Sequence, residues 1–433
     1  FVAFDKSDFV GRDAALIARE SAPERRLTLL SIDSHDADAS GDEGVRLDGK
    51  LVGFTTSGAY GHHVGQSLAL AYLDAALVDA ATSGIGPEVT AEALRVLHRV
   101  GQLANITINL EHLPFGGASI DKHGEPITQA VLDRALQAHA TLMGACGGPK
   151  WDALPTDKRP EKGLLRLREY MEVYANLRPA KLFRALSDAS PLKAERAAGF
   201  DFIVVRELVG GLYFGKPRSV QGAPGQRVGV NTMTYQESEI VRIGKVAFET
   251  ARQRKKKLLS VDKANVLEVM GLWRDVMTQL GKTQYPDVQL SHMYVDNAAM
   301  QMILRPTDFD VLVMENMFGD ILSDLSAAAT GSIGLLPSAA IGDKLALYEP
   351  IHGSAPDIAG QNKANPLAAI MTIAMLFEHT LKRADLAAAV NGAVEDVLDA
   401  GARTADLAKP GQPVLGTNQM GDAVLKAVER RLA

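Results

Sequence analysis

The chain has 433 residues, of which 46% are hydrophobic and 23% are charged, and it holds one cysteine. This length and composition allow two or three domains with hydrophobic cores and exclude a wholly disordered chain. A single cysteine excludes a disulfide framework and is typical of a reducing compartment, so we expect a cytoplasmic protein. The longest apolar stretch, residues 366–377, is shorter than the roughly 20 residues that cross a bilayer, so no membrane partner is expected.

The charge is distributed unevenly along the chain. The net charge of −6 lies within residues 1–83, which carry 7 Lys and Arg residues against 13 Asp and Glu residues. The remaining 350 residues carry 39 of each kind, and this balance argues against nucleic acid as a partner. The basic run 252–257 follows a helical pattern, so we interpret it as a solvated helix end.

Residues 1–83 are predicted to form a small all-β, barrel-like module with one short helix at 13–20. Strand-like runs separated by Gly-rich segments follow at 26–32, 44–47, 50–55 and 67–72. Asp48-Gly49 predicts a two-residue hairpin between the second and third runs. His62 and His63 are adjacent, so on a strand they point to opposite faces, and no metal site is expected there.

From Gly84 onward, helical and strand-like patterns alternate, which is typical of an α/β protein. Helical patterns cover residues 87–101, 125–140, 161–176 and 235–254. Strand-like runs cover residues 202–205, 258–261 and 311–314. The segment 83–87, Ser-Gly-Ile-Gly-Pro, is interpreted as a turn into the first of these helices.

Asp320 and Asp324 are four residues apart, so on a helix they share one face. Like charges at this spacing are stabilised by a cation, and carboxylate oxygens suit Mg²⁺ or Mn²⁺ better than zinc. The alternative is that both aspartates are solvated at the start of a helix, and the residues alone leave both interpretations open.

Basic residues stand at the ends of predicted elements. Arg206 ends an apolar strand-like run, and Arg168 and Arg178 lie on and just beyond the helical pattern 161–176. Guanidinium groups bind carboxylates in bidentate fashion, so three arginines suit a dianionic or trianionic acid, although each one alone is more typical of a surface. Lys263 follows the run 258–261, where a lysine with a lowered pKa can act as a general base.

Asp357 in the loop 351–357 can bind a ribose diol.

Taken in order, these segments resemble the β-decarboxylating dehydrogenase family of isocitrate, isopropylmalate and tartrate dehydrogenases. The resemblance covers residues 84–433 and is carried by short motifs at 147–151, 175–179, 262–265, 294–296, 318–324 and 352–357. It implies a two-domain fold with a large mixed sheet, distinct from the Rossmann fold. A cofactor-side domain would comprise residues 84–173 and 331–433, and a substrate, metal and dimerisation domain residues 174–330.

The N-terminal module resembles the C-terminal barrel of the aminomethyltransferase (glycine-cleavage T-protein) family. The matching stretches are 8–12, 23–27 and 56–61. The folate pocket and catalytic carboxylate of that family lie mostly in an earlier domain, so no one-carbon chemistry is expected from this module.

The dehydrogenase resemblance also implies the site residues. Arg168, Arg178 and Arg206 would bind the substrate carboxylates, and Leu164 and Leu165 would face its variable arm. Mg²⁺ or Mn²⁺ would be held by Asp320 and Asp324 with Asp296 of a neighbouring subunit, which would also contact substrate. Lys263, also across a homodimer interface, would help remove the hydroxyl proton, and Tyr213 would help protonate the enolate. The residues expected to bind NAD are Ile85, Glu161, His352, Gly353, Ser354, Ala355, Asp357 and Asn365.

The implied activity is oxidative decarboxylation of (2R,3S)-3-isopropylmalate to 2-oxo-4-methylpentanoate with reduction of NAD⁺, in leucine biosynthesis. Two leucines suit an isopropyl arm, whereas the third carboxylate of isocitrate would stay unpaired beside them. Asp357 would repel a 2′-phosphate and so favours NAD over NADP. A sister activity on tartrate, an alkylmalate or isocitrate is the alternative.

The resemblance breaks at its start. The family begins with an apolar strand ending in Gly-Asp-Gly-Ile-Gly-Pro-Glu, whereas here Ser83 replaces the Asp and residues 75–81 stand in place of the strand. The chain therefore resembles a fusion of two unlike pieces. Loss of a strand exposes backbone polar groups and costs stability, which leaves a non-catalytic fusion as a further alternative. Our hypothesis is that residues 73–81 substitute for the strand, although Ala and Asp are weak strand formers.

Overall fold

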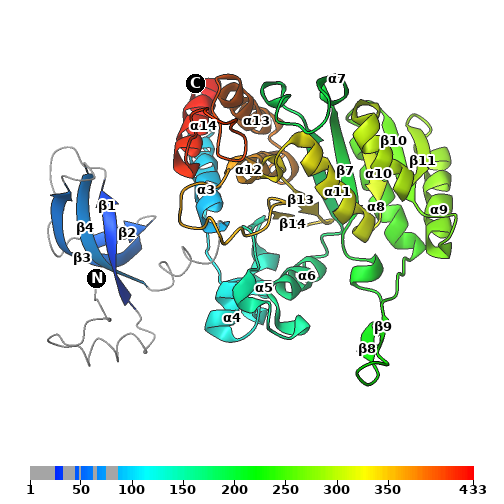
Figure 1. Ribbon diagram of the computed structural model, residues 1–433, viewed down its shortest axis with the longest axis horizontal. Helices are drawn as coiled ribbons and strands as arrows, with labels where there is room; N and C mark the ends of the chain where they lie inside the picture. The colour runs from blue at the N-terminus through cyan, green and yellow to red at the C-terminus, as the bar shows by residue number, and fades with distance from the viewer. Residues whose placement is uncertain (1–24, 33–43, 48–49, 62–65, 75–85) are drawn as a thin grey trace. The chain divides into compact units, whose positions relative to one another are not determined.

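The computed structural model describes residues 25–32, 44–47, 50–61, 66–74 and 86–433. The chain divides into two compact units, Phe1–Thr82 and Ser83–Ala433 (Figure 1). The helix predicted at 13–20 and the pair His62-His63 lie outside the described residues.

The N-terminal unit contains a four-stranded antiparallel sheet in the order β1-β4-β3-β2. Its strands are β1 (Arg25–Ile32), β2 (Gly44–Leu47), β3 (Lys50–Gly61) and β4 (Gln66–Asp74). All four predicted strands are confirmed, and β3 continues beyond its predicted end. Leu47 pairs with Lys50, as the predicted two-residue hairpin requires.

The second unit is built on an eight-stranded sheet in the order β11-β10-β12-β7-β6-β13-β14-β5. These strands are β5 (Thr141–Leu142), β6 (Ala175–Lys181), β7 (Asp201–Glu207), β10 (Lys257–Asp262), β11 (Gln289–Tyr294), β12 (Val311–Met314), β13 (Ala339–Ile341) and β14 (Ala346–Tyr348). Strands β7, β12, β10 and β11 pair in parallel, as do β14 and β5, whereas β6 and β13 pair antiparallel with both neighbours. The predicted large mixed sheet is confirmed.

Helices surround this sheet. They are α3 (Gly86–Leu103), α4 (Gly117–His123), α5 (Gln129–Gln137), α6 (Pro160–Tyr170), α7 (Ala194–Ala197), α8 (Glu237–Arg252), α9 (Glu268–Gln284), α10 (Val295–Leu304), α11 (Asn316–Thr330), α12 (Leu367–His379), α13 (Ala384–Asp399) and α14 (Thr417–Leu432). The longest apolar stretch of the sequence forms α12, which is buried along almost its whole length and packs against α3 and α13. A hairpin of β8 (Ser219–Gln221) and β9 (Val228–Val230) projects from the unit (Figure 1). Among the described residues, no helix combines the length and apolar character needed to span a bilayer.

The predicted helix 161–176 is too long. Helix α6 ends at Tyr170, Glu172 has a positive φ of 52°, and Ala175 begins β6. A non-glycine residue with positive φ does not continue a right-handed helix, so the chain turns there and leaves as a strand. Arg178 therefore lies within β6 rather than just beyond a helix.

Strand β5 forms one edge of the sheet and has only two residues. The hypothesis that residues 73–81 supply a further strand is wrong for the part the structure describes. Leu73 and Asp74 belong to β4, where Leu73 pairs with Arg26 and Gly53. Residues 75–81 lie outside the described residues. The predicted division of the second unit into two domains stays a prediction.

Candidate active site

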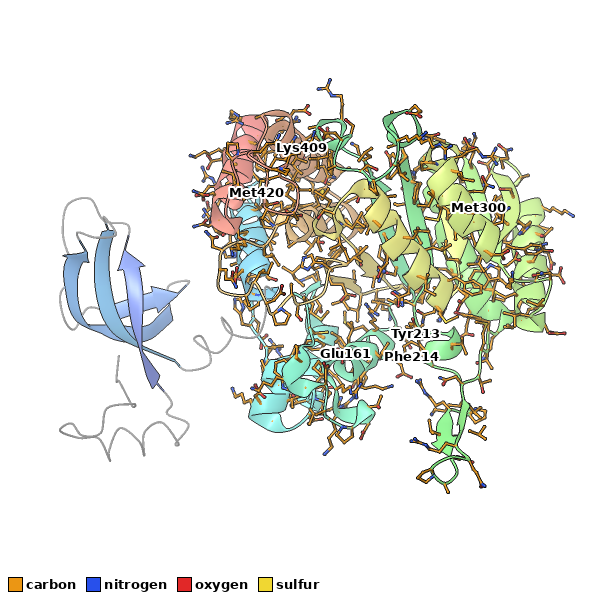
Figure 2. The ribbon with its side chains drawn as sticks, viewed as in Figure 1. Glu161, Tyr213, Phe214, Met300, Lys409 and Met420 are labelled. Carbon is orange, nitrogen blue, oxygen red and sulfur yellow. The ribbon has the colours of Figure 1, made fainter. Side chains whose placement is uncertain are left out.

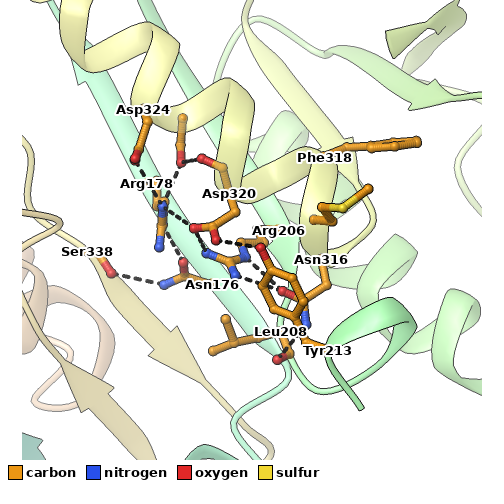
Figure 3. A network of polar contacts seen from close by, with 12 residues as sticks. Asn176, Arg178, Arg206, Leu208, Tyr213, Asn316, Phe318, Asp320, Asp324 and Ser338 are labelled. Carbon is orange, nitrogen blue, oxygen red and sulfur yellow. Dashed lines mark hydrogen bonds and ion pairs between the residues drawn. The ribbon is translucent and has the colours of Figure 1, made fainter. Parts of the chain in front are cut away.

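The sheet and one helix bring predicted site residues into contact. Asn176 and Arg178 are two apart on β6, so their side chains leave the same face of the sheet. Arg206 pairs with Asn176 in the β6–β7 register, which places its side chain on that face too. Helix α11, which carries Asp320 and Asp324, packs against both strands (Figure 3). Strand register and helix spacing therefore direct arginines and aspartates toward one another.

Asp320 is the centre of these contacts. Its Oδ1 accepts a hydrogen bond from Nη1 of Arg206 and lies 3.5 Å from Nη1 of Arg178. Its Oδ2 accepts a 2.9 Å hydrogen bond from the hydroxyl of Tyr213, which ends the short helix η4 (Gly211–Tyr213). Asp324 Oδ1 lies 3.8 Å from Nη1 of Arg178. Asp320 is therefore paired with buried arginines rather than merely solvated, whereas the side chain of Asp324 is 61% exposed.

These contacts set the charge states of the groups. Burial raises the pKa of Asp320, but Arg206 and Arg178 outweigh burial, so its pKa is below the usual value. Burial and the charge of Asp320 raise the pKa of Tyr213 to about 12. Burial and the nearby charge of Arg206 lower the pKa of Arg178 to about 9. At neutral pH, Asp320 is an anion, Arg178 is a cation and Tyr213 keeps its proton.

A glycine permits the close approach of α11 to the sheet. A Cβ atom at Gly319 would lie 2.5 Å from Cγ of Arg206, a separation that real Cβ atoms do not tolerate. The glycine therefore lets the helix rest directly on the arginine side chain. This contact brings the next residue, Asp320, within hydrogen-bonding distance of the guanidinium.

A cavity of about 160 Å³ brings substrate and cofactor predictions together. Five predicted site residues line it: Leu164, Arg168, Arg178, His352 and Gly353. Within it, Nη2 of Arg168 donates a hydrogen bond to Glu349, and both side chains are buried. Nε of Arg168 is buried without a hydrogen-bond partner among the described residues, so it can donate to a ligand. Leu165 is partly buried and does not line this cavity.

A cysteine also lines the cavity. Burial raises the pKa of the Cys146 thiol to about 12, with smaller contributions from the charges of Glu349 and Glu161. The thiol is therefore protonated and unreactive as a nucleophile at neutral pH. A Cβ atom at Gly147, the residue after Cys146, would lie 2.7 Å from Oε1 of Glu161, so this glutamate in the first turn of α6 lies beside the same segment.

The loop 351–357 holds most of the predicted NAD residues. Nε2 of His352 is buried and has no hydrogen-bond partner within the described ranges, whereas Nδ1 lies 3.0 Å from the carbonyl oxygen of Gly353. Burial lowers the pKa of His352, so its ring is neutral at pH 7. Ser354 is buried, Ala355 has a positive φ of 36°, and Asp357 is exposed. An unpaired buried nitrogen and an exposed carboxylate on one loop fit a polar ligand such as a dinucleotide.

Besides Glu161 on α6, two predicted cofactor residues lie outside this loop, namely Asn365 and Ile85. Asn365 precedes α12, where its Oδ1 accepts a 3.0 Å hydrogen bond from the backbone of Leu367 and its Nδ2 donates to Asp406 at 3.0 Å. Ile85 lies outside the described residues.

Lys263 and Asp296 form a separate group. Lys263 follows β10, Asp296 lies in the first turn of α10, and Nζ of the lysine donates to Oδ1 of the aspartate. No hydrogen bond or ion pair in the described part of the chain joins them to Asp320 or Asp324. Accordingly, no group of three acidic, His or Cys side chains able to hold a metal occurs among the described residues. Their contribution from a neighbouring subunit stays a prediction.

The cluster of charged side chains that extends from the cavity to α11 is balanced. The cluster contains three guanidinium groups and three carboxylates: Arg168, Arg178, Arg206, Asp320, Asp324 and Glu349. A dicarboxylic acid brings two further negative charges, which are poorly tolerated in a buried site unless a dication enters with it. The carboxylate oxygens of Asp320 and Asp324 are suitable ligands for Mg²⁺ or Mn²⁺ as this dication. The residues present therefore fit the predicted metal, with further ligands from outside this group.

Sequence analysis missed several residues of this cluster. Glu349 directly follows the buried strand β14, and a charge at the end of a buried strand is the signal that singled out Arg206. Arg178 donates 2.6 Å hydrogen bonds to Asn176 and to Ser323. Neutral polar residues of this kind give no signal until the strand register is known.

A larger hollow of about 220 Å³ lies along β10, β11 and β12. Lys257, Gln289 and Phe309 are among its lining residues, and none of the predicted site residues contributes to it. The smaller cavity, where charged groups converge, is therefore the candidate active site.

Named proteins and a solved structure are similar to this chain in sequence and fold. The 3-isopropylmalate dehydrogenase of Saccharophagus degradans is 55% identical over 343 residues, covering 79% of this chain and 96% of the relative. That of Hydrogenovibrio crunogenus is 53% identical over 347 residues, covering 80% and 97%. The solved isocitrate dehydrogenase from Methylococcus capsulatus is 33% identical, with a TM-score of 0.71 over 80% of this chain and 97% of that one.

Both resemblances seen in the sequence are confirmed. Residues 25–100 match the glycine cleavage T-protein C-terminal barrel domain. Residues 78–424 match the isocitrate/isopropylmalate dehydrogenase family, so the two matches overlap at 78–100. The second match spans most of the chain, which therefore belongs to the isocitrate/isopropylmalate dehydrogenase family.

Proposed function

We propose that this chain is an NAD-dependent, divalent-metal-dependent enzyme of leucine biosynthesis that converts (2R,3S)-3-isopropylmalate to 2-oxo-4-methylpentanoate and CO₂. The observation that carries the proposal is the cavity in which Leu164 lies beside Arg168 and Arg178. Guanidinium groups bind carboxylates, and a leucine accepts an isopropyl arm but leaves a third carboxylate unpaired. Relatives named 3-isopropylmalate dehydrogenase, matched over nearly their whole length, support the same substrate.

The side chains of this chain bind the substrate and move its protons. The three arginines hold its carboxylates, and Lys263 of a neighbouring subunit accepts the hydroxyl proton as C2 is oxidised. CO₂ then leaves, and the electron pair of the broken C–C bond remains on the substrate as an enolate. Tyr213 donates its proton to C3 of the enolate and then recovers a proton from solvent. Its pKa of about 12 keeps the proton in place until then.

The chemistry that NAD⁺ would supply is acceptance of the hydride from C2, and the chemistry that Mg²⁺ or Mn²⁺ would supply is Lewis-acid polarisation of the substrate. Asp320 and Asp324 would hold the metal, with Asp296 of the neighbouring subunit. The loop 351–357 would hold NAD⁺, together with Ile85, Glu161 and Asn365. The unpaired Nε2 of His352 supports a ligand there, and the exposed Asp357 disfavours a 2′-phosphate.

We further propose a homodimer with shared active sites. Large apolar side chains are exposed on adjacent helices, namely Met300 on α10 (Figure 2) and Ile321 on α11. Their exposed fractions are 51% and 58%. Val220 on the projecting β8–β9 hairpin is 71% exposed. A two-stranded hairpin is only marginally stable alone, and exposed apolar groups of this size favour burial against another surface.

The domain division and the location complete the proposal. Residues 84–173 and 331–433 would form the cofactor-side domain, and residues 174–330 the substrate, metal and dimerisation domain. The single cysteine supports a reducing, cytoplasmic location.

The test follows NADH formation by the full chain from 3-isopropylmalate and NAD⁺. We expect turnover with Mg²⁺ or Mn²⁺ that is lost on adding EDTA and restored by excess metal. Isocitrate and tartrate are offered in parallel. Preference for either would favour the sister activity, and a folded dimer without turnover would favour the non-catalytic fusion.

Two neighbouring leucines provide a matched pair of variants. Leu164→Ser places a hydroxyl in the cavity wall and is expected to lower kcat/KM for isopropylmalate by about 10- to 100-fold. Leu165→Ser makes the same change outside the cavity and is expected to have the smaller effect. Equal losses in both variants would contradict the assignment of the apolar arm to Leu164.

A further inference from the structure

One buried amide connects two parts of the site. Asn316 is the first residue of α11, and its side chain is completely buried. Its Oδ1 accepts hydrogen bonds from Nε and Nη2 of Arg206 at 3.0 and 2.8 Å. Its Nδ2 donates to the carbonyl oxygens of Leu208 and Gly210 at 3.0 and 3.1 Å. Both lone pairs and both protons of the amide are therefore used.

The two carbonyl groups lie on the connection that leads to Tyr213. This connection leaves β7 after Glu207, turns at Gly211, where φ is +69°, and ends in η4. The hydroxyl of Tyr213 then reaches Oδ2 of Asp320 at 2.9 Å (Figure 3). The same amide thus contacts a guanidinium at the end of β7 and the base of the turn that carries the tyrosine.

Further buried groups hold this amide in place. Glu207 accepts hydrogen bonds from the backbone N–H groups of Val209 (3.1 Å) and Gly210 (2.8 Å). The hydroxyl of Tyr235 donates to Glu207 at 3.0 Å and accepts from the backbone N–H of Asn316 at 3.1 Å. Both the backbone and the side chain of Asn316 are therefore fixed, so the residue cannot follow a displaced arginine or turn.

We propose that Asn316 is a positioning residue that couples the arginine that binds the substrate to the tyrosine that donates the proton. The inference rests on the proposed function, which supplies the roles of Arg206 and Tyr213. The amide oxygen orients the guanidinium of Arg206. The amide nitrogen holds the turn so that the hydroxyl of Tyr213 faces the cluster. Asn316 acts through these two residues and not on the substrate itself.

Two substitutions separate the two halves of the amide. Asn316→Asp keeps an oxygen acceptor for Arg206 but replaces the donor that faces the carbonyls of Leu208 and Gly210. Asn316→Ala removes both contacts. A matched control is Thr330→Val at the other end of α11, where a buried hydroxyl donates to the backbone of Ala327 at 2.8 Å. The control removes a buried hydrogen bond from the same helix without touching Arg206 or the turn.

The expected kinetic result is a split between the variants. Asn316→Ala raises KM for isopropylmalate and lowers kcat, and a displacement of about 1 Å in such groups costs on the order of 100-fold in rate. Asn316→Asp lowers kcat with the smaller change in KM. Thr330→Val keeps both constants near those of the unchanged chain.

The position of the proton donor is read directly from the product. In D₂O, the unchanged chain is expected to place solvent deuterium on one face of C3, because Tyr213 donates from one side. Asn316→Asp is expected to give a mixture of both configurations, since solvent then protonates the enolate. The deuterated products are enantiomers, so NMR distinguishes them after stereospecific transamination to leucine, whose second stereocentre makes them diastereomers. Retained stereochemistry with an unchanged kcat in Asn316→Asp would overturn the proposal, as would the same KM and kcat changes in both variants.

A crystal structure of Asn316→Asp tests the inference without turnover. We expect the contact between Tyr213 and Asp320 to be lost while that between Arg206 and Asp320 remains, and retention of both contacts would overturn the proposal. Asp preserves the shape of the side chain, so this variant carries the test if Asn316→Ala does not fold. If the unchanged chain is inactive, only the proposed function is refuted. The comparison of the Asn316→Asp structure with that of the unchanged chain would still test whether Asn316 positions Tyr213.

Discussion

The two groups of proposed catalytic residues differ in how completely one chain assembles them. Arg206, Asp320 and Tyr213 contact one another, and Arg206 is only 2% exposed. Lys263 and Asp296 contact each other at the surface, where Asp296 is 67% exposed. Buried charges are held by obligatory partners, whereas exposed ion pairs are weak and easily exchanged. Under the proposed mechanism, folding of one chain would complete the proton-donating side, and assembly would be left to complete the proton-accepting side.

The largest effect is expected where the buried group is broken. Arg206→Lys replaces a planar fork, which reaches both Asn316 and Asp320, with a single ammonium group. We expect kcat/KM to fall by about 1000-fold and the free energy of unfolding to fall by about 3 kcal/mol, since a buried acceptor loses its partner. Steady-state kinetics and urea unfolding measure the two losses.

The same substitution at an exposed ion pair is the control. Arg184 lies on the surface, 3.2 Å from Asp399, and an exposed pair contributes little to stability. Arg184→Lys should therefore leave activity and stability nearly unchanged. Similar effects in the two variants would remove the distinction between buried and exposed groups.

A mixing experiment tests whether the exposed pair is completed by a second subunit. Tyr213→Phe and Lys263→Ala homodimers are each expected to be nearly inactive. After dissociation and random reassociation, half of the dimers contain one chain of each kind. If Lys263 acts across the interface, each mixed dimer holds one intact site, so about one quarter of the original activity returns.

The alternative arrangement gives a clear contrary result. If Lys263 acts within its own chain, every site of a mixed dimer lacks one residue and no activity returns. Mixing each variant with itself controls for recovery that is caused by refolding alone.

The smallest effect on activity is expected from a group whose protonation changes the stability of the fold. Burial raises the pKa of Glu207, which supports the turn before Tyr213, to about 7 from an ordinary value of 4.5. Between these values the unfolded chain releases this proton and the folded chain keeps it, so the contribution to stability is present below pH 4.5 and is lost as pH rises to 7. The stability difference between the unchanged chain and Glu207→Gln should shrink by about 3 kcal/mol over this window.

The exposed pair should respond to pH in the opposite direction. Lys263 lowers the pKa of Asp296, so any contribution of this carboxylate is present at neutral pH and is lost as pH falls. Urea unfolding of the unchanged chain, Glu207→Gln and Asp296→Asn across this range compares the two regions. A Glu207→Gln difference that does not vary with pH would show that Glu207 is ionised in the folded protein.

The sequence predicted charged residues of the site better than the bounds of the elements that carry them. Arg206 was found because a charge at the end of an apolar run needs a partner, and Asp320 and Asp324 because of their helical spacing. The helix 161–176 was overextended because the pattern does not reveal the positive φ of Glu172. The sequence could not indicate Asn316, since a neutral amide becomes significant only when β7 and α11 lie side by side.

The balanced charge of the cavity affects how a substrate arrives. Three guanidinium groups beside three carboxylates exert little net field on a distant ion, and the Lys263–Asp296 pair adds none. Electrostatic steering should therefore contribute little to the association rate, which should vary only weakly with ionic strength. Dicarboxylates in the surrounding solution would enter at similar rates. Discrimination among them would occur after entry, through differences in how fast each one leaves.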